Sequence, residues 1–438
     1  MGEEVAIIVG LRLPSGTREE SEESLEELAA LTEASGARVV ERVLQSRARV
    51  DGRTFIGTGK ASELKERAQE IGANLIVIDH DLSPAQGRNL EKLTDRKVLD
   101  RTELILDIFA RRARTPVAKQ QVEVAQLEYL LPRLTRLWEH LSRTGGGIGT
   151  RGPGETQLEV DRRRIRNRLT DLRRRLARTG EQRERHRTLH PGLFRVALVG
   201  YTNTGKSTLM NRLTTANVSS RDRLFETLDA TTRILDLGPG YHATLTDTVG
   251  FVRRLPHTLV ESFRATLGEV ASADLLLHVI DVSAPSRHAR EKAVEDVLRE
   301  IGAADVPCVS VWNKVDLVPV PEREGLKKAT AEDPDVVVVS AARGEGIEDI
   351  REAIRRHIRN EWIDVHGTLP IAEGEVLARV RAVAEVVDER VDEDTISLHL
   401  RLPPSEWGRL RSAYEGRAPG LFRTSAVTIP VVDSPPRE

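Results

Sequence analysis

The stretch Gly200-Tyr201-Thr202-Asn203-Thr204-Gly205-Lys206-Ser207 decides the fold of this 438-residue chain. It fits the pattern G-x-x-x-x-G-K-S, follows the continuously apolar run 196–199 and precedes the helix-forming residues 208–213. A strand, a glycine-rich loop and a helix in this order bind phosphate, because the glycines let phosphates approach main-chain N–H groups at the helix N-terminus. In such a loop Lys206 bridges the β- and γ-phosphates, and the Ser207 hydroxyl is a ligand of Mg²⁺. The sequence therefore predicts a P-loop nucleotide-binding domain.

Three further motifs follow in the order typical of a guanine-nucleotide-binding (G) domain, each after an apolar run. Asp247-Thr248-Val249-Gly250 matches D-x-x-G, whose aspartate holds the metal through water and whose glycine amide senses the γ-phosphate. Asn313-Lys314-Val315-Asp316 matches N-K-x-D, whose aspartate accepts guanine N1–H and the 2-amino group. Adenine offers neither donor, so a buried, unpaired Asp316 would cost roughly 3–5 kcal/mol. Ser340-Ala341-Ala342 matches the loop whose backbone amide contacts guanine O6, and the site is expected at the carboxyl ends of the sheet.

The two switch regions need separate comment, because the threonine of the first is not fixed by the pattern and the second departs from it. The first switch lies between residues 214 and 233, and its threonine must reach Mg²⁺ and the γ-phosphate. Three threonines fit on chemistry alone: Thr227, Thr231 and Thr232. Phe251 stands directly after D-x-x-G, where Ras-like GTPases carry a glutamine that orients the attacking water. Phenylalanine neither donates nor accepts a hydrogen bond, so we expect slow intrinsic hydrolysis and assign no catalytic residue.

Length and composition exclude several classes of protein. The chain is about three times the ~150-residue unit that one hydrophobic core usually occupies, so two or three domains are expected. Hydrophobic residues make up 39%, too many for a disordered chain, and no apolar run approaches the ~18 residues that a membrane-spanning helix needs. The single cysteine, Cys308, excludes a disulfide framework, and the acidic start Met1-Gly2-Glu3-Glu4 is unlike a secretory signal. We expect a soluble, intracellular protein.

Charge is distributed unevenly although the chain is nearly neutral. Residues 111–191 hold 20 Lys and Arg against 9 Asp and Glu, a balance of +11 in a chain whose total is −2. A basic segment of this kind favours a polyanionic partner such as nucleic acid, and the alternative is a solvated helix surface.

The same basic segment carries two apolar stripes at helical spacing. The first stripe is Val124, Leu127, Leu131, Leu134, Trp138 and Leu141, and the second is Leu158, Ile165, Leu169, Leu172 and Leu176. Two such stripes predict an antiparallel helical hairpin with arms of ~40 Å or more, kinked at Pro132. Its connecting loop, residues 145–154, is richer in glycine than a passive turn requires and predicts a binding tip.

The rest of the chain divides on either side of the G domain. The first hundred residues alternate strand patterns (5–9, 38–44, 74–78) with helix patterns (21–32, 60–71, 83–93, 101–111), which predicts a small α/β domain with a mainly parallel sheet. Near the C-terminus an alternating strand at 396–402 precedes a helix opened by Ser405. We therefore expect an N-terminal α/β subdomain (1–115), a basic hairpin with a Gly-rich tip (116–190), a G domain (193–360) and a small C-terminal α/β module (365–438).

With these motifs in place, the chain resembles the HflX family of translational GTPases along nearly all of its length. The resemblance rests on the phosphate loop, on Phe225-Glu226-Thr227-Leu228-Asp229, on D-x-x-G followed by Phe251, and on Gly145-Gly146-Gly147 through Gly152-Pro153-Gly154-Glu155-Thr156-Gln157. It implies a G domain with a mixed, mostly parallel six-stranded sheet. It also implies that Thr227 is the switch threonine and a Mg²⁺ ligand, and that an apolar residue at position 251 is a family trait.

The resemblance further implies a cytoplasmic GTP hydrolase that binds GTP and GDP with Mg²⁺, binds the 50S ribosomal subunit and splits stalled or stressed 70S ribosomes. Its tip residues Gly145, Gly146, Gly147, Arg151 and Gly152 would enter the peptidyl-transferase region of 23S rRNA. A long basic arm with a slim tip suits an RNA-lined cavity. We expect a monomer.

Two alternative functions and one local ambiguity remain. The chain is alternatively a GTP-dependent RNA-binding or ribosome-assembly switch, or an RNA-remodelling ATPase that works through its N-terminal domain. The resemblance suggests ATP use in that domain, where Gly57-Thr58-Gly59-Lys60 lacks the full phosphate-loop spacing and better fits a plain strand-to-helix turn. Asn203 either coordinates a monovalent cation beside the phosphates or stabilises the loop.

Overall fold

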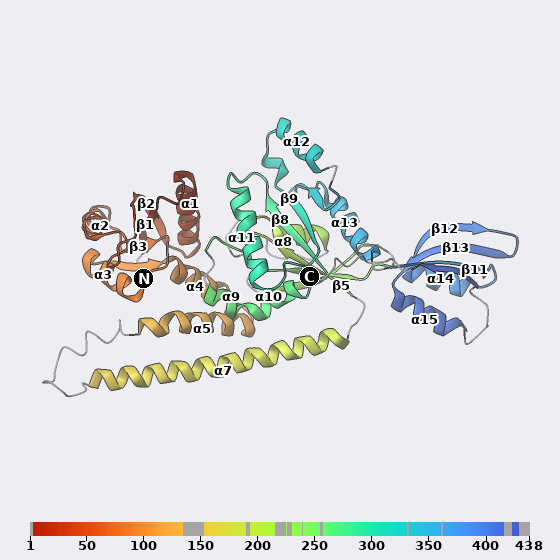
Figure 1. The fold of residues 1–438 in the computed structure, drawn as a ribbon, viewed down its shortest axis with the longest axis horizontal. Helices are drawn as coiled ribbons and strands as arrows, with labels where there is room; N and C mark the ends of the chain where they lie inside the picture. The colour runs from red at the N-terminus through yellow and green to blue at the C-terminus, as the bar shows by residue number, and fades with distance from the viewer. Residues whose placement is uncertain are drawn as a thin grey trace.

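The computed structural model describes residues 3–134, 153–189, 193–214, 225, 230–238, 240–254, 257–330, 333–360, 362–415 and 423–428. Three β-sheets follow one another along the long axis of the molecule, and the helix α7 runs beneath the first two (Figure 1). Within the described ranges, no helix combines the length and the apolar character that a membrane span requires.

The first sheet belongs to the N-terminal domain and is entirely parallel, in the order β2-β1-β3-β4. Its elements are β1 (Val5–Arg12), α1 (Arg18–Ala34), β2 (Arg38–Ser46), α2 (Thr58–Ile71), β3 (Leu75–Ile78), α3 (Pro84–Thr94), β4 (Lys97–Asp100) and α4 (Arg101–Arg112). The alternation of strands and helices predicted from the sequence is confirmed. The prediction missed β4, because this four-residue strand passes directly into α4 without a separating turn.

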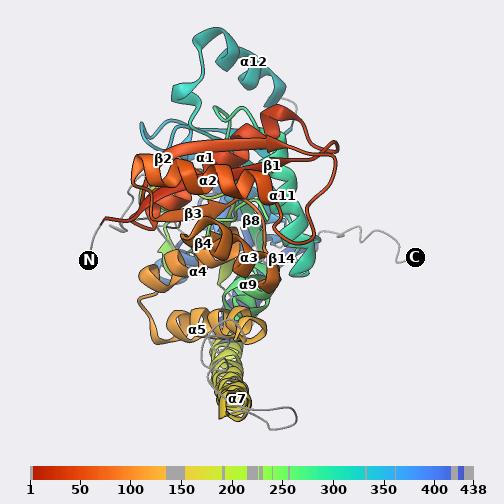
Figure 2. The same ribbon diagram turned by 90° about the vertical axis from the view of Figure 1, so that its left-hand side faces the viewer.

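The basic segment forms α5 (Pro116–Leu130), a short 3₁₀ turn (Leu131–Arg133) and the 37-residue α7 (Pro153–Leu189). Pro132 lies in the turn that ends α5, where the kink was expected. Val124 of α5 is buried with Leu169 and Leu172 of α7, as the two stripes predicted. Figure 2 shows α7 end-on while α5 lies across the view, so these two helices cross at an angle rather than running side by side. The far end of the first stripe (Trp138, Leu141) and the Gly-rich tip lie outside the described residues.

The middle sheet has six strands in the order β10-β9-β8-β5-β7-β6, and only β6 is antiparallel to its neighbour. Its first half comprises β5 (Phe194–Val199), α8 (Lys206–Leu213), β6 (Thr231–Leu235), β7 (Ala243–Asp247), α9 (His257–Ser262) and α10 (Arg264–Ala271). Its second half comprises β8 (Leu275–Asp281), α11 (Arg287–Glu300), β9 (Cys308–Asn313), a 3₁₀ turn (Val315–Leu317), α12 (Val320–Thr330), β10 (Val336–Val338) and α13 (Ile347–Arg359). The mixed, mostly parallel six-stranded sheet is confirmed.

The last sheet is antiparallel, in the order β12-β13-β11-β14, and has its own hydrophobic core. Its elements are β11 (Ile363–Pro370), α14 (Gly374–Val383), β12 (Glu385–Val391), β13 (Thr395–Leu402), α15 (Pro404–Glu415) and β14 (Arg423–Thr428). The strand at 396–402 and the helix after it are confirmed as β13 and α15, and the element order is that of a split β-α-β module.

The N-terminal domain and the G domain share one core. A single cluster of buried side chains runs from β1, α1 and α4 into the G domain, where it includes Phe225, Phe251 and Phe263. Phe109 of α4 meets Phe225 edge-on at a ring-centroid distance of 4.7 Å and Phe263 at 5.3 Å. Folding of these two parts is therefore expected to be cooperative.

Candidate nucleotide-binding site

The phosphate loop connects β5 to α8 and is held tightly against neighbouring strands. Gly200 has φ of 147° and faces the Val279 carbonyl of β8, while Gly205 has φ of 94° and faces the Asn313 side chain. A Cβ atom at either position would collide with these groups, so only glycine fits. Tyr201, Thr202 and Thr204 are buried and Asn203 is exposed with a left-handed φ of 60°, which asparagine tolerates. The proposed cation role of Asn203 stays a prediction.

Lys206 is buried and curls back over its own loop. Its Nζ donates to the carbonyl oxygens of Gly200 at 3.0 Å and Tyr201 at 2.7 Å. Burial lowers the pKa of Lys206 to about 8, against the opposing effect of the nearby Asp247 carboxylate. A polyphosphate beside this desolvated ammonium group would supply the negative charge that favours its protonated form.

The expected metal ligands lie next to the lysine. Ser207 donates its hydroxyl proton to Asp247 Oδ2 at 2.7 Å. A Cβ atom at Gly250 would stand 2.7 Å from Thr202 Cα and 3.0 Å from Lys206 Nζ, so the D-x-x-G glycine contacts the phosphate loop. A hydroxyl and a carboxylate are oxygen ligands of the type that Mg²⁺ prefers, and these residues therefore fit that ion.

The base-recognition loops are tied to the phosphate loop and to each other. Asn313 Nδ2 donates to the Thr204 carbonyl at 2.7 Å, and Asn313 Oδ1 accepts the Ala341 N–H at 2.9 Å. Ser340 Oγ donates to Asp316 Oδ1 at 2.7 Å, which fixes the carboxylate expected to face guanine. The structure thus brings together N-K-x-D, the Ser-Ala-Ala loop and the phosphate loop, as their order in the sequence predicted. Lys314 has φ of 64° and forms an ion pair with Asp281 at 2.9 Å.

The second switch runs along the phosphate loop as a short parallel bridge. Phe251 donates its N–H to the Gly200 carbonyl at 3.1 Å and accepts from the Thr202 N–H at 2.7 Å. These bonds place the Phe251 side chain, 1% exposed, in the core shared with the N-terminal domain. Phe251 therefore cannot orient a water molecule, in agreement with the expectation from its chemistry, and the catalytic residue stays unassigned.

Within the first switch, the structure describes residues 214, 225 and 230–233, and Phe225 is the one that contacts the phosphate loop. Its N–H donates to Thr202 Oγ1 at 3.1 Å, and its buried ring packs on Phe109 of the N-terminal domain. Thr231 and Thr232 are strand residues of β6, and the Thr232 hydroxyl lies 2.9 Å from that of Thr246. Glu226, Thr227, Leu228 and Asp229 lie outside the described residues.

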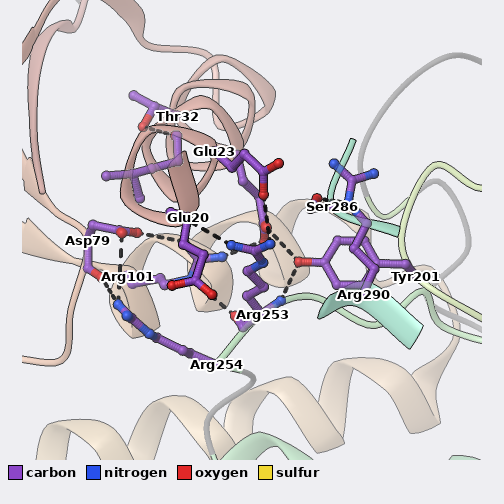
Figure 3. Close-up of polar contacts among 12 residues, drawn as sticks. Glu20, Glu23, Thr32, Asp79, Arg101, Tyr201, Arg253, Arg254, Ser286 and Arg290 are labelled. Atoms are coloured by element: carbon purple, nitrogen blue, oxygen red, sulfur yellow. Dashed lines mark hydrogen bonds and ion pairs between the residues drawn. The ribbon is translucent and has the colours of Figure 1, made fainter. Parts of the chain in front are cut away.

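Arg101 of α4, 1% exposed, forms the centre of a polar network between the N-terminal and G domains (Figure 3). It makes ion pairs with Glu27 and, at 2.6 Å, with Asp79, and its Nε donates to the Arg253 carbonyl at 3.2 Å. Tyr201 of the phosphate loop donates its hydroxyl proton to Glu27 at 2.5 Å and accepts the Arg253 N–H at 2.6 Å. Burial and the Glu27 carboxylate raise the pKa of Tyr201, which keeps the phenol protonated.

Two arginines that directly follow the second switch complete this contact. Arg253 pairs with Glu23 of α1 at 2.9 Å, and Arg254 donates to the Asp79 carbonyl at 2.9 Å (Figure 3). We call the contact made by Glu23, Glu27, Asp79 and Arg101 with Tyr201, Arg253 and Arg254 the N-terminal junction. Sequence reasoning missed it, although an acidic first helix and an Arg-Arg pair after D-x-x-G are complementary signals.

A six-stranded, mostly parallel sheet that carries a phosphate loop, D-x-x-G and N-K-x-D is the architecture of a P-loop guanine-nucleotide hydrolase. Three family models match the chain. The model described as GTP-binding GTPase N-terminal matches residues 22–110, GTP-binding GTPase Middle Region matches 112–189, and 50S ribosome-binding GTPase matches 195–314.

Whole-length relatives identify the family. GTPase HflX of Escherichia coli (strain K12) is 44% identical over 401 residues, which are 90% of this chain and 93% of that protein. GTPase HflX of Magnetococcus marinus is 43% identical over 417 residues, which are 94% of this chain and 95% of that protein. The chain belongs to the HflX family of GTPases and is a GTP hydrolase.

A solved structure is similar at lower identity. The crystal structure of a GTP-binding protein from Sulfolobus solfataricus in complex with GDP covers 81% of this chain and 98% of that chain, at 23% identity and a TM-score of 0.43.

Proposed function

We propose that this GTPase binds the 50S ribosomal subunit in its GTP state and splits stalled or stressed 70S ribosomes, with the Gly-rich tip reaching the peptidyl-transferase region of 23S rRNA. The observation that carries the proposal is the N-terminal junction, because it joins the phosphate loop and second switch to the domain from which the basic arm extends. Such an activity places the protein in the cytoplasm, where ribosomes work.

The charge and length of α7 support an RNA partner. At 1.5 Å per residue its 37 residues span about 55 Å. Arg168 and Arg173 pair with Glu123 and Glu128 of α5 at 2.7 Å and so hold the two helices together. Six other arginines among the described side chains of α7 are exposed to solvent: Arg163, Arg164, Arg166, Arg174, Arg175 and Arg178. Exposed arginines on a long helix can neutralise RNA phosphates and release their counterions.

The nucleotide-dependent step follows from the contacts of the switches. In GTPases the switch segments are ordered by the γ-phosphate and released on hydrolysis. Here Phe225 of the first switch packs on Phe109, and Arg253, directly after the second switch, contacts Tyr201 and Glu23 of the N-terminal domain. Loss of the γ-phosphate therefore loosens the contacts that hold the N-terminal domain, and with it the arm, in one orientation.

Mg²⁺ belongs to the same proposal. Ser207 and Thr227 would hold it directly and Asp247 through water. When bound, the ion neutralises charge that develops on the phosphate oxygens. Lys206 would add a second positive group beside the phosphates, and the Gly250 amide would respond to the γ-phosphate.

The test is co-sedimentation with purified 50S and 70S particles in a non-hydrolysable GTP analogue, together with light scattering of 70S particles to follow splitting. We expect binding to 50S subunits and loss of 70S particles. A variant with Arg163, Arg166 and Arg174 all changed to Glu should bind at least tenfold more weakly and with a flatter salt dependence.

The matched control changes Arg379, Arg390 and Arg409 of the C-terminal module to Glu, the same alteration of net charge on other exposed arginines. This control should retain most of the affinity if α7 is the contact. Equal losses in the two variants would contradict a specific role for α7. Failure of the wild-type protein to sediment with mature particles would favour the ribosome-assembly alternative.

A further inference from the structure

Arg212, near the C-terminal end of α8, reaches out of the phosphate-loop helix to the Ser-Ala-Ala loop. Its Nε donates to the Ala341 carbonyl at 3.0 Å and its Nη2 to the Ala342 carbonyl at 2.6 Å. Each carbonyl belongs to a peptide whose plane sets the direction of the neighbouring N–H. One guanidinium thus fixes two consecutive peptides of the loop expected to meet guanine O6.

Arg323, in the first turn of α12, makes a similar clamp on the other base-recognition loop. Its Nη2 donates to the Asp316 carbonyl and its Nε to the Val318 carbonyl, both at 2.6 Å. These bonds hold the short 3₁₀ turn at 315–317 that follows Lys314. The side chain of Asp316 is held from the opposite side by Ser340 at 2.7 Å.

A continuous chain of hydrogen bonds links the phosphate loop to the base-recognition loops. Arg212 of α8 bonds the Ala341 carbonyl, the Ala341 N–H bonds the Asn313 side chain, and that side chain bonds the Thr204 carbonyl of the phosphate loop. Phosphate-binding and base-binding elements are therefore kept at a fixed separation, and Arg323 fixes Asp316 relative to that frame.

We propose that Arg212 and Arg323 are positioning residues for guanine specificity: Arg212 orients the loop amides toward O6, and Arg323 orients the Asp316 carboxylate toward N1–H and the 2-amino group. This inference rests on the proposed base site. Neither arginine belongs to a motif of the site. Both clamps need the planar fork of arginine, since a lysine ammonium presents the same charge without two fixed parallel donors.

The two residues are distinguishable with three nucleotides. GDP has O6, N1–H and the 2-amino group, inosine diphosphate has O6 and N1–H but no 2-amino group, and ADP has none of the three. Arg323→Lys disturbs the partner of the 2-amino group, so GDP affinity should fall more than that of inosine diphosphate and their ratio should shrink roughly five- to tenfold. Arg212→Lys disturbs a contact common to both, so both should weaken equally, by a similar factor, relative to ADP.

The experiment measures the dissociation constants of the three diphosphates by calorimetry for the full chain and its variants. Arg299→Lys is the matched control, because Arg299 is an exposed α11 arginine paired with Asp296 and remote from both loops. Thermal unfolding of each variant separates misfolding from a change in specificity, and Arg→Gln versions show whether charge alone matters.

The outcomes separate the inference from the site on which it rests. A wild-type protein that binds GDP and ADP equally would end the proposed base site itself. The wild-type protein could instead discriminate among the nucleotides while the Lys variants keep every affinity ratio and the Gln variants lose them. That result would overturn the clamp, because it would show that the charge of the arginines matters and their two fixed donors do not. Unchanged ratios in both the Lys and Gln variants would remove any role of the two arginines in specificity.

Discussion

The G domain contacts the N-terminal domain and the C-terminal module in different ways. The contrast indicates which neighbour a change of nucleotide would affect more strongly. At the N-terminal junction the two domains share a core, and Arg101 is buried with Glu27 and Asp79. The C-terminal junction is smaller: Tyr241 stacks on Trp362 at 4.7 Å, and Arg359 lies 3.4 Å from Glu385. Both of these charged side chains are partly exposed.

The two junctions also touch different parts of the G domain. The N-terminal junction includes Tyr201 of the phosphate loop and residues adjoining the second switch. The C-terminal junction involves the turn between β6 and β7 and the end of α13. A buried charge network at a switch is sensitive to small shifts, because a buried ion that loses its partner is costly.

Arg101→Met should have the largest effect. It leaves Glu27 and Asp79 without their shared cation, and breaking a buried ion pair typically costs about 3–5 kcal/mol. We expect a loss of that size in the free energy of unfolding measured with urea. The matched change in the C-terminal module, Arg381→Met, removes a largely exposed pair with Glu389 and should cost less than about 1 kcal/mol. Similar losses in the two variants would contradict the contrast.

Acidification should destabilise the G domain through the buried His278. Burial lowers the pKa of His278 in β8 to about 4, with Lys206 adding to the shift and Glu291 opposing it. The folded protein therefore binds this proton less readily than the unfolded chain, whose histidine pKa is about 6.5. The contribution of His278 to the free energy of unfolding is therefore fully present above pH 6.5, and about 2 kcal/mol of it is lost by pH 5.

The histidine effect is isolated by comparing wild type with His278→Gln in urea at pH 7 and pH 5. Burial also raises the pKa of Glu103 to about 7, which favours folding by a similar amount, about 2 kcal/mol, as pH falls from 7 to 5 and so largely cancels the histidine effect in the wild type. The difference between the two proteins removes this common contribution. The variant should lose about 2 kcal/mol less than wild type on acidification, and an identical pH dependence would show that His278 does not titrate as inferred.

Tyr201→Phe should loosen the contact between the phosphate loop and the residues that follow the second switch. The change removes the hydroxyl that donates to Glu27 and accepts the Arg253 N–H, which costs about 1–3 kcal/mol locally. We expect faster hydrogen exchange at the amides of residues 251–254, with GDP affinity changed less than about threefold. Exchange rates equal to those of wild type would mean that the hydroxyl does not hold the second switch.

Glu385→Gln should have the smallest effect. It weakens the contacts of Glu385 with Tyr241 and Arg359 at the C-terminal junction, which are partly exposed and worth less than about 1 kcal/mol. Stability and nucleotide affinity should stay close to wild type. A loss comparable to that of Tyr201→Phe would show that the C-terminal junction is as strongly coupled to the site as the N-terminal one.

Local signals predicted the parts of the fold that depend on local chemistry. The phosphate loop, N-K-x-D and the Ser-Ala-Ala loop follow buried strands, and the structure brings them together as their order implied. β13 was found because it alternates strictly between buried and half-buried residues. β12, with mostly exposed residues, gave no such pattern and was missed.

Long-range contacts explain what sequence reasoning could not reach. The bond between Tyr201 and Glu27 joins residues 174 positions apart, and that between Arg101 and Arg253 joins residues 152 apart. Nothing in a local pattern reveals such pairing. Phe251 was recognised as unable to act on water, but only its main-chain bonds to Gly200 and Thr202 explain why its side chain turns into the core.

The β6–β7 hairpin has one further consequence. At one end Thr231 is paired with Asp247, beside the phosphate loop, and at the other Leu235 is paired with Ala243, next to the turn that carries Tyr241. One stiff ribbon therefore begins at the triphosphate pocket and ends against the last module of the chain. A displacement of Thr231 on nucleotide exchange would therefore also shift the turn that contacts Trp362, even though the C-terminal junction is the weaker of the two contacts.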